Sequence, residues 1–201
     1  MNNFFCFPVT ISRSGWGQRL WIKNNFFNFY RLESFQTIET KEIIHIKKYK
    51  QFLLDSGAFT YLNSKKDSVV NWEKYINDYA NFIKKHDIKY FFELDIDPIV
   101  GLKEVERLRN ILEKKTGKKS IPVWHKSRGL EYWKKMVKNY NYVAIGGIVT
   151  KEIKQKEYPV FTKLLKIAKE NNCKVHGLGF TNLKGLTKYK FYSVDSTSSG
   201  S

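Results

Sequence analysis

Three aspartates of this sequence each follow a short apolar segment. They lie in Phe52-Leu-Leu-Asp55, in Phe91-Phe-Glu-Leu-Asp95 and in Phe191-Tyr-Ser-Val-Asp195. An apolar run that ends in a carboxylate is typical of a buried parallel strand whose C-terminal end faces a site. A single aspartate of this kind could simply cap the next helix. Three of them, separated by helix-length intervals, predict carboxylates gathered around one pocket.

Small and polar residues accompany these aspartates as further site candidates. The candidates are Ser56, Gly57, His125, Gly146, Gly147, His176, Gly177 and Gly179. Asp55-Ser56-Gly57 favours a tight turn, which either caps itself or leaves backbone N–H groups for a ligand. Gly146-Gly147 permits either a close backbone approach to a flat ligand or a sharp bend. His125 and His176 either bind a ligand or form satisfied internal hydrogen bonds.

Asp95 and Asp97 alternate along the sequence, so on a strand both side chains would point to the same face. Two such carboxylates could bind Mg²⁺, raise one another's pKa, or divide between ligand and scaffold. Pro98 ends the strand, so Asp97 could equally belong to a loop. A metal-dependent barrel enzyme that uses this pair is therefore an alternative, and sensitivity to EDTA would reveal it.

Charge and cysteine content limit the classes of partner and cofactor. Lys and Arg number 36 against 19 Asp and Glu, which gives a formal net charge of +17. This excess indicates either a solvated lysine-rich surface or a polyanionic partner such as nucleic acid. Cys6 and Cys173 are the only cysteines, and no CxxC or HxxxH spacing occurs. Neither a disulfide framework nor a zinc site within these residues is expected, and no cofactor is predicted.

The sequence contains no sign of a membrane segment or a secretory signal. No apolar run approaches the roughly 18 residues that a membrane span needs. The N-terminus lacks the basic start and long apolar region of a signal peptide. A cytoplasmic location is expected, which would be the host cytoplasm if the protein is viral.

Strand and helix patterns alternate from residue 52 onward. Strands are predicted at 52–55, 89–95, 121–124, 142–145, 174–176 and 191–194, and helices near 71–85, 102–115, 130–137 and 159–169. On the first of these helices, apolar residues recur at helical spacing from Trp72 to Ile83 and predict a stripe that faces the core. The first fifty residues are poorly readable: 4–11 is a candidate strand, and 15–35 predicts a long loop or short hairpin.

Alternating strands and helices require crossover connections and a parallel sheet, which makes the predicted fold class α/β. The chain either closes into a TIM-type barrel or forms a doubly wound sheet, and no GxGxxG supports a dinucleotide-binding fold. Loops after every strand of a barrel converge on one face, so the recurring polar strand ends favour the barrel. We predict one domain over residues 1–198, an irregular (β/α)8 barrel that lacks its final unit or is incomplete at the C-terminus, with a tail over 199–201.

Five segments resemble, in the right order, the signature segments of tRNA-guanine transglycosylases. They are Asp55-Ser-Gly-Ala-Phe59, Leu94-Asp-Ile96, Ala144-Ile-Gly-Gly-Ile-Val149, His176-Gly-Leu-Gly179 and Val194-Asp-Ser-Thr197. The resemblance spans roughly residues 50 to 198. It is greatest to the archaeal-type pattern and to the short phage and bacterial relatives that insert 7-deazaguanines into DNA. It implies an irregular TIM barrel and a base exchange at the glycosidic carbon without a redox cofactor.

The resemblance also implies a role for each candidate residue. Asp195 would be the nucleophile that attacks C1′ and holds a covalent glycosyl intermediate, and Asp55 would be the general acid and base. The residues it implies for binding the base are Ser56, Gly57, Asp95, His125, Gly146, Gly147, His176, Gly177 and Gly179. The family usually has Val-Gln-Gly-Gly where this chain has Val123-Trp-His-Lys126, so Trp124 or His125 would replace the glutamine. The family's zinc site of three Cys and one His has no counterpart in this sequence.

The implied activity is replacement of guanine in DNA by a free 7-deazaguanine such as 7-cyano-7-deazaguanine. A base inside a duplex must be flipped out for this reaction, and excess Lys and Arg would hold the phosphates meanwhile. DNA is favoured over tRNA because the chain is short and lacks the tRNA-reading extension and the zinc. A tRNA-guanine transglycosylase and a non-catalytic nucleic-acid or nucleobase-binding barrel are the alternatives. The oligomeric state is not predicted.

Overall fold

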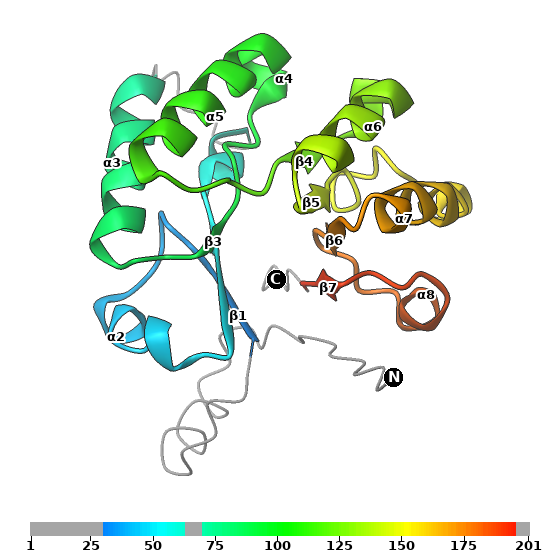
Figure 1. Ribbon diagram of the computed structural model, residues 1–201, viewed down its shortest axis with the longest axis horizontal. Helices are drawn as coiled ribbons and strands as arrows, with labels where there is room; N and C mark the ends of the chain where they lie inside the picture. The colour runs from blue at the N-terminus through cyan, green and yellow to red at the C-terminus, as the bar shows by residue number, and fades with distance from the viewer. Residues whose placement is uncertain (1–29, 63–69, 196–201) are drawn as a thin grey trace. The chain divides into compact units, whose positions relative to one another are not determined.

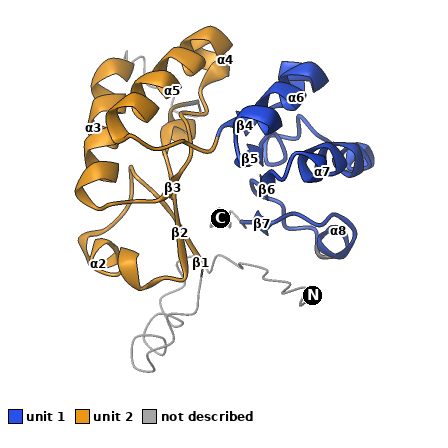
Figure 2. Ribbon diagram, viewed as in Figure 1, with its two compact units in different colours: residues 1–26, 122–201 blue, residues 27–121 orange. Residues whose placement is uncertain are grey.

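The computed structural model describes residues 30–62 and 70–195 of the chain (Figure 1). These residues divide into two compact units, and each is described by itself (Figure 2). Unit 2 holds the described residues up to Ile121, and unit 1 holds those from Pro122 onward. The candidate strand over 4–11 and the predicted tail over 199–201 lie outside the described residues.

Unit 2 is built on a parallel three-stranded sheet of order β1-β2-β3. Its elements are β1 (Tyr30–Ser34), α2 (Thr40–Ile43), η1 (Ile46–Lys48), β2 (Gln51–Asp55), η2 (Ala58–Leu62), α3 (Trp72–Lys85), β3 (Tyr90–Phe91), α4 (Asp97–Val100) and α5 (Leu102–Thr116). β1 pairs with β2 along its whole length, and Ser34 lies opposite Asp55. An isolated parallel bridge joins Phe92 to Ile121 just after β3.

The helix α3 packs into the core of unit 2 through the apolar stripe that its sequence predicts. Ile76, Tyr79 and Ile83 of this stripe are fully buried. Asn71 caps the helix because its side chain accepts a hydrogen bond from the N–H of Lys74 at 2.9 Å. The neighbouring helix α5 ends at Thr116, and Gly117 follows it with the left-handed φ of +68° that is common just after a helix (Figure 1). Both long helices therefore begin and end within about two residues of the predicted bounds.

The strand β1 contradicts the prediction of a loop or hairpin over residues 15–35. Its residues alternate between apolar and charged side chains, and Arg31 and Glu33 form an ion pair on one face. All five residues are only half-buried. In the described part of the sheet β1 pairs with β2 alone, so it can form without a continuous apolar run. The absence of such a run is why the sequence does not reveal this strand.

The predicted strand over 89–95 is shorter in the structure, and Asp97 does not belong to it. β3 ends at Phe91, one further bridge follows at Phe92, and residues 93–96 have no regular secondary structure. Asp97 starts α4 with Pro98 in the first turn, where the fixed φ of proline suits a helix. Asp95 and Asp97 therefore do not share one face of a strand.

Unit 1 is built on a parallel four-stranded sheet of order β4-β5-β6-β7. Its elements are β4 (Val123–Trp124), η3 (Lys126–Arg128), α6 (Gly129–Asn139), β5 (Tyr142–Ile145), η4 (Gln155–Glu157), α7 (Val160–Glu170), β6 (Lys174–Gly177), α8 (Leu183–Lys188) and β7 (Ser193–Val194). The strands follow one another in sheet order, and a helix separates each from the next. This alternation confirms the predicted pattern for the second half of the chain.

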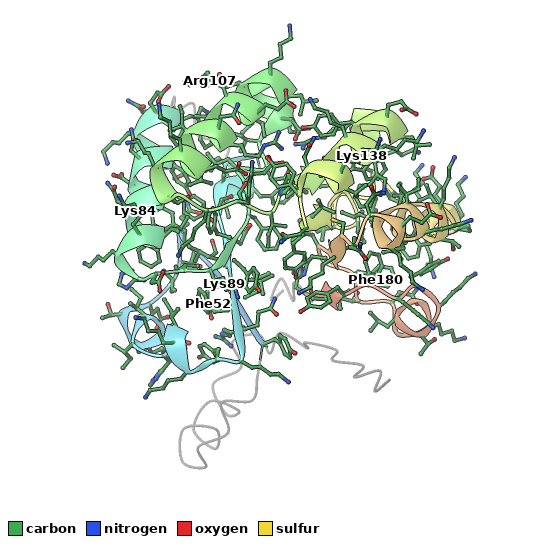
Figure 3. The ribbon with its side chains drawn as sticks, in the orientation of Figure 1. Phe52, Lys84, Lys89, Arg107, Lys138 and Phe180 are labelled. Atoms are coloured by element: carbon green, nitrogen blue, oxygen red, sulfur yellow. The ribbon has the colours of Figure 1, made fainter. Side chains whose placement is uncertain are left out.

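Each unit has its own hydrophobic core. In unit 1 the rings of Trp133, Phe161 and Phe180 are almost completely buried and contact further aromatic side chains. Charged side chains such as Lys84 of α3 and Lys138 of α6 lie on the exposed sides of their helices (Figure 3). The parallel strands that alternate with amphipathic helices confirm the α/β class with parallel sheets. Among the described residues, no helix is both long enough and apolar enough to cross a lipid bilayer.

Candidate functional site

The C-terminal ends of the four strands of unit 1 bring most of the predicted site residues to one edge of its sheet. His125 follows β4, Gly146 and Gly147 follow β5, Gly177 ends β6, and Asp195 follows β7. Because β4 to β7 are parallel neighbours, these positions lie side by side. These four strand ends therefore lie at one edge of the sheet of unit 1, whereas Asp55 and Asp95 belong to unit 2, so the gathering of all three aspartates around one pocket stays a prediction.

Asp195 is a buried carboxylate that is held by one of its two oxygens. Asp195 is 5% exposed to solvent. Oδ1 accepts a hydrogen bond from the backbone N–H of Gly179 at 2.6 Å and lies 3.3 Å from Nε2 of His176. Gly179 has a φ of +66°, which places its N–H in a turn that other residues adopt only with strain. Within the described part of the chain, Oδ2 has no hydrogen-bond partner, so one oxygen is fixed and the other is available.

A chain of hydrogen bonds links Asp195 through His176 to the interior of unit 1. Nδ1 of His176 lies 2.6 Å from Oγ of Ser193, and this hydroxyl lies 2.6 Å from the hydroxyl of Tyr142. If Asp195 is ionised, its carboxylate can only accept a hydrogen bond, so Nε2 of a neutral His176 donates to it. Nδ1 of His176 then accepts a hydrogen bond from the hydroxyl of Ser193. Ser193 then accepts from Tyr142. All four groups are buried, and their donors and acceptors match in one direction.

Sequence reasoning missed Ser193 and Tyr142 as members of this site. Ser193 lies two residues before Asp195 on β7, and it pairs in register with His176 on β6. The two-residue period of a strand could have placed Ser193 on the same face as Asp195. The contact to Tyr142 depends on the sheet order β5-β6-β7, which a single sequence does not reveal.

Gly146 and Gly147 lie against a second histidine–carboxylate pair, which is partly buried. His125 Nδ1 lies 3.0 Å from Oε2 of Glu152, and Oε1 of Glu152 accepts from the N–H of Ser127 at 2.9 Å. A Cβ atom at Gly146 would lie 2.8 Å from the ring of His125, and one at Gly147 would lie 2.6 Å from Glu152. Packing therefore favours glycine at 146, and the left-handed φ of +77° favours glycine at 147, whether or not a ligand also approaches them. Sequence reasoning missed Glu152.

Trp124 is a core residue, which leaves His125 as the site residue of its segment. The indole of Trp124 is 3% exposed, packs edge-on against Trp133, and donates its N–H to the carbonyl of Gly129 at 2.8 Å. Of the two predicted replacements for the family's glutamine, only His125 ends at the sheet edge with the other candidates.

In unit 2, Asp55 lies in a turn at the end of β2. Its Oδ2 accepts the N–H of Gly57 at 3.2 Å, and its backbone carbonyl accepts the N–H of Phe35 at 2.8 Å. Ser56 is buried, whereas Asp55 itself is only half-buried. Asp55 thus makes the capping contact that its sequence predicts and still exposes part of its side chain to solvent.

Two tyrosines of α3 position this turn. The hydroxyl of Tyr75 donates to the carbonyl of Ser56, and that of Tyr79 lies 3.0 Å from the carbonyl of Leu54 and 3.1 Å from that of Phe92. Burial, followed by the charges of Tyr61 and Asp55, raises the pKa of Tyr75 well above its ordinary value. Tyr75 therefore stays protonated and remains a hydrogen-bond donor to the turn. The predicted apolar stripe of α3 thus also carries the hydroxyls that fix the loop after β2.

Asp95 lies in the irregular segment between β3 and α4 and is half-buried. Two residues earlier, Glu93 is fully buried and forms an ion pair of 2.9 Å with Arg109 of α5, whose side chain is 8% exposed. This pair was not predicted, although Arg109 falls four residues after Val105 on the buried face of α5. A charged residue on each of two buried faces is the signal that could have revealed it.

Comparison with known proteins does not place this chain in a family. No family model matches it, and no curated protein matches it. Among solved structures, it is similar to the crystal structure of citrate synthase SbnG, with a TM-score of 0.46 and 8% sequence identity. The similarity covers 87% of this chain and 88% of that one.

Proposed function

We propose that the protein is a base-exchange glycosyltransferase that replaces guanine in DNA by a 7-deazaguanine derivative. The observation that carries the proposal is how the carboxylate of Asp195 is held at the strand ends of unit 1. One oxygen is fixed by Gly179 and His176, and the other has no hydrogen-bond partner among the described residues. A buried carboxylate with one oriented, available oxygen suits attack on the anomeric carbon of a nucleoside.

The proposed reaction consists of two displacements at C1′. Oδ2 of Asp195 forms a bond to C1′ while the bond from C1′ to the guanine nitrogen breaks, and the electron pair goes to that nitrogen. Asp55, as a carboxylic acid, gives the leaving base a proton. The incoming 7-deazaguanine then loses its ring N–H proton to the Asp55 carboxylate and attacks C1′, which releases Asp195. The configuration is retained because each displacement inverts it once.

The remaining roles in this proposal rest on the resemblance to tRNA-guanine transglycosylases. Asp95 would bind the amidine edge of the base, and the backbone of Gly146 and Gly147 would bind its carbonyl side. Ser56, Gly57, His125, His176, Gly177 and Gly179 would line the base-binding site. Parallel strands that alternate with helices in both units support an irregular (β/α)8 barrel over residues 1–198. The reaction needs neither a metal nor a redox cofactor.

The decisive experiment is incubation with DNA and 7-cyano-7-deazaguanine, followed by mass spectrometry of the nucleosides. We expect the wild-type protein to insert the modified base and to form a trappable covalent adduct with DNA. Asp195→Asn should abolish both, because the amide cannot act as the nucleophile. Asp78→Asn, which removes an exposed carboxylate on α3, is the matched control and should retain activity.

The outcomes of this experiment separate the competing functions. Exchange on tRNA but not on DNA, measured side by side with labelled guanine, would assign the tRNA substrate. Binding of DNA without exchange by the wild-type protein would indicate a non-catalytic binding module. Full exchange by a folded Asp195→Asn protein would contradict the role of Asp195.

A further inference from the structure

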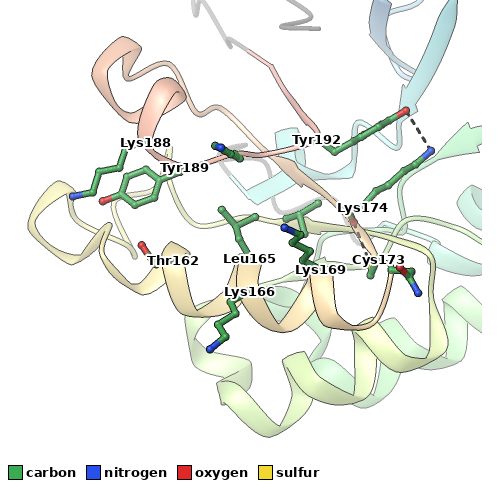
Figure 4. A pocket seen from close by; sticks show the side chains of 12 residues that line it. Thr162, Leu165, Lys166, Lys169, Cys173, Lys174, Lys188, Tyr189 and Tyr192 are labelled. Atoms are coloured by element: carbon green, nitrogen blue, oxygen red, sulfur yellow. Dashed lines mark hydrogen bonds between the residues drawn. The ribbon is translucent and has the colours of Figure 1, made fainter. Parts of the chain in front are cut away.

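Unit 1 contains a cavity of about 520 Å³ (Figure 4). Its lining includes the start of β6 and residues just before β7, whereas Asp195 follows the C-terminal end of β7. The cavity lies between α7, the start of β6 and the segment that leads from α8 to β7. The residues that line it are Thr162, Leu165, Lys166, Lys169, Asn172, Cys173, Lys174, Val175, Lys188, Tyr189, Lys190 and Tyr192. We call this cavity the lysine cleft.

The lysine cleft concentrates positive charge that no acidic residue balances. Five of its lining residues are lysines, and none is Asp or Glu. Within the described part of the chain, none of these five ammonium groups forms an ion pair with a carboxylate. Elsewhere in unit 1, Lys134 pairs with Glu131 and Lys126 pairs with Glu157. Like charges held around one cleft repel each other, so an anion that enters it relieves this repulsion.

Neutral donors and aromatic rings complete the lining. Lys174 Nζ lies 3.3 Å from the hydroxyl of Tyr192 and 4.4 Å from the centroid of its ring (Figure 4). The ring of Tyr192 is 42% exposed, and Lys188 Nζ lies 5.4 Å from the ring of Tyr189. Thr162 and Asn172 add a hydroxyl and an amide. Lysines interleaved with tyrosines and neutral donors are the side chains that contact phosphates and sugars of nucleic acids.

The chemistry of the lining excludes two other uses of the lysine cleft. Burial raises the pKa of the Cys173 thiol to about 12, so this cysteine is protonated near neutral pH and is a poor nucleophile. The lining contains no carboxylate or histidine that would hold a hard divalent cation. Its residues therefore suit an anionic ligand that is bound without covalent chemistry.

The lysine cleft and Asp195 lie at opposite ends of the strands β6 and β7. Lys174 begins β6, and Gly177 ends this strand opposite Val194, the residue before Asp195. The rise of a strand puts roughly 10 Å between Lys174 and Gly177. This length corresponds to about three nucleotide steps of a DNA strand at 3.4 Å each.

We propose that the lysine cleft binds the phosphodiester backbone of DNA at nucleotides that flank the target base. The choice of DNA rests on the proposed function, whereas the anionic nature of the ligand follows from the lining itself. Phosphate contacts of this kind would fix the register of the DNA and contribute no base specificity.

The test measures binding of a labelled 20-base-pair DNA duplex between 50 and 200 mM NaCl. The cleft variant combines Lys166→Gln, Lys169→Gln and Lys190→Gln. We expect the slope of log affinity against log salt to become less steep by roughly two to three, since each lost phosphate contact removes about 0.9. Replacing the same three lysines by arginine should preserve the slope, because the charge is kept.

A control variant removes the same charge from exposed lysines outside the lysine cleft. It combines Lys84→Gln and Lys103→Gln in unit 2 with Lys138→Gln in unit 1. Its slope should stay at the wild-type value. Equal losses in the cleft and control variants would overturn the proposal, because they would show a diffuse effect of net charge. Equal affinity for a polyglutamate of matched charge would also overturn it, because the site would not be one for DNA.

The binding measurement does not depend on base exchange, so the two proposals fail separately. If the wild-type protein shows no exchange but the cleft variant alone loses DNA binding, the lysine cleft is supported and the proposed reaction is contradicted. If exchange is observed and the cleft variant binds DNA with the wild-type slope, the reaction is supported and the lysine cleft is contradicted.

Discussion

At the scale of single residues, His176 connects the carboxylate of Asp195 to the interior of unit 1. Its Nε2 faces Asp195 at 3.3 Å, and its Nδ1 faces Ser193 at 2.6 Å. The imidazole cannot rotate freely without losing one of these contacts. In the proposed reaction, His176 would therefore position the carboxylate of Asp195, in addition to its proposed contact with the base.

Substitutions of His176 test whether base exchange depends on the N–H that its Nε2 presents to Asp195. His176→Leu removes the donor, and exchange should fall by roughly 10- to 100-fold, as for other partners that orient a reactive group. His176→Gln retains an amide N–H at a similar position and should restore part of the rate. The rates are measured at saturating DNA and base, with circular dichroism to confirm folding. Equal rates for both variants would contradict the positioning role.

The buried ion pair of Glu93 and Arg109 makes a prediction about stability. Glu93→Ala leaves the Arg109 charge buried without its closest carboxylate partner, and should lower the free energy of unfolding by about 3–5 kcal/mol. Glu104→Ala, which breaks the exposed pair with Arg107, is the control and should cost less than about 1 kcal/mol. Urea unfolding measures both. An equal loss of unfolding free energy for the two substitutions would contradict this prediction, because burial would then not make the Glu93–Arg109 pair more important for stability.

At the scale of elements, the sequence predicts long amphipathic helices well and short strands poorly. α3 and α5 repeat apolar residues over four turns, so their faces and caps are visible in the sequence. β3, β4 and β7 each contain only two residues in regular pairing. Strands this short are defined by their neighbours in the sheet, and those neighbours are distant in sequence. The strand ends that carry Asp55, Gly146 and Asp195 were nevertheless predicted, because each follows a buried apolar run.

The turn after β2 depends on the lack of a side chain at Gly57. A Cβ atom there would lie 2.5 Å from Oγ of Ser34 and 2.8 Å from Cβ of Gln36, and the φ is +71°. Gly57→Ala should therefore add a steric cost of about 1–3 kcal/mol to the left-handed backbone strain. Gly117→Ala is the matched control, because its φ is +68° but no atom lies within 4 Å of the added Cβ. It should lose only the strain, about 1–2 kcal/mol.

Thermal and urea unfolding of both glycine variants test this account of the turn. Adding Ser34→Ala to Gly57→Ala should recover part of the loss, since it removes the closest atom. Equal destabilisation of Gly57→Ala and Gly117→Ala would show that the packing of β1 against the turn is not tight.

At the scale of the whole molecule, the α/β class with parallel sheets was predictable, whereas the organisation of the chain was not. Alternation of strands and helices follows from local periodicity, which is present in the sequence. The division into unit 1 and unit 2, each with its own hydrophobic core, depends on which apolar faces meet. Many different pairings of these faces satisfy the same periodicity, so a single sequence does not select among them.

The proposal of one barrel domain predicts that the two units unfold together. Ile145 in unit 1 and Ile83 in unit 2 are both fully buried, and replacing either by valine should cost about 0.5–1.5 kcal/mol. In a single cooperative domain, the slowest-exchanging amides open only by global unfolding. Each substitution should then lower the opening free energy of these amides by the same amount in both units, as measured by native-state hydrogen exchange. If Ile145→Val affects only unit 1 and Ile83→Val affects only unit 2, the units are separate domains, and the single-barrel proposal is wrong.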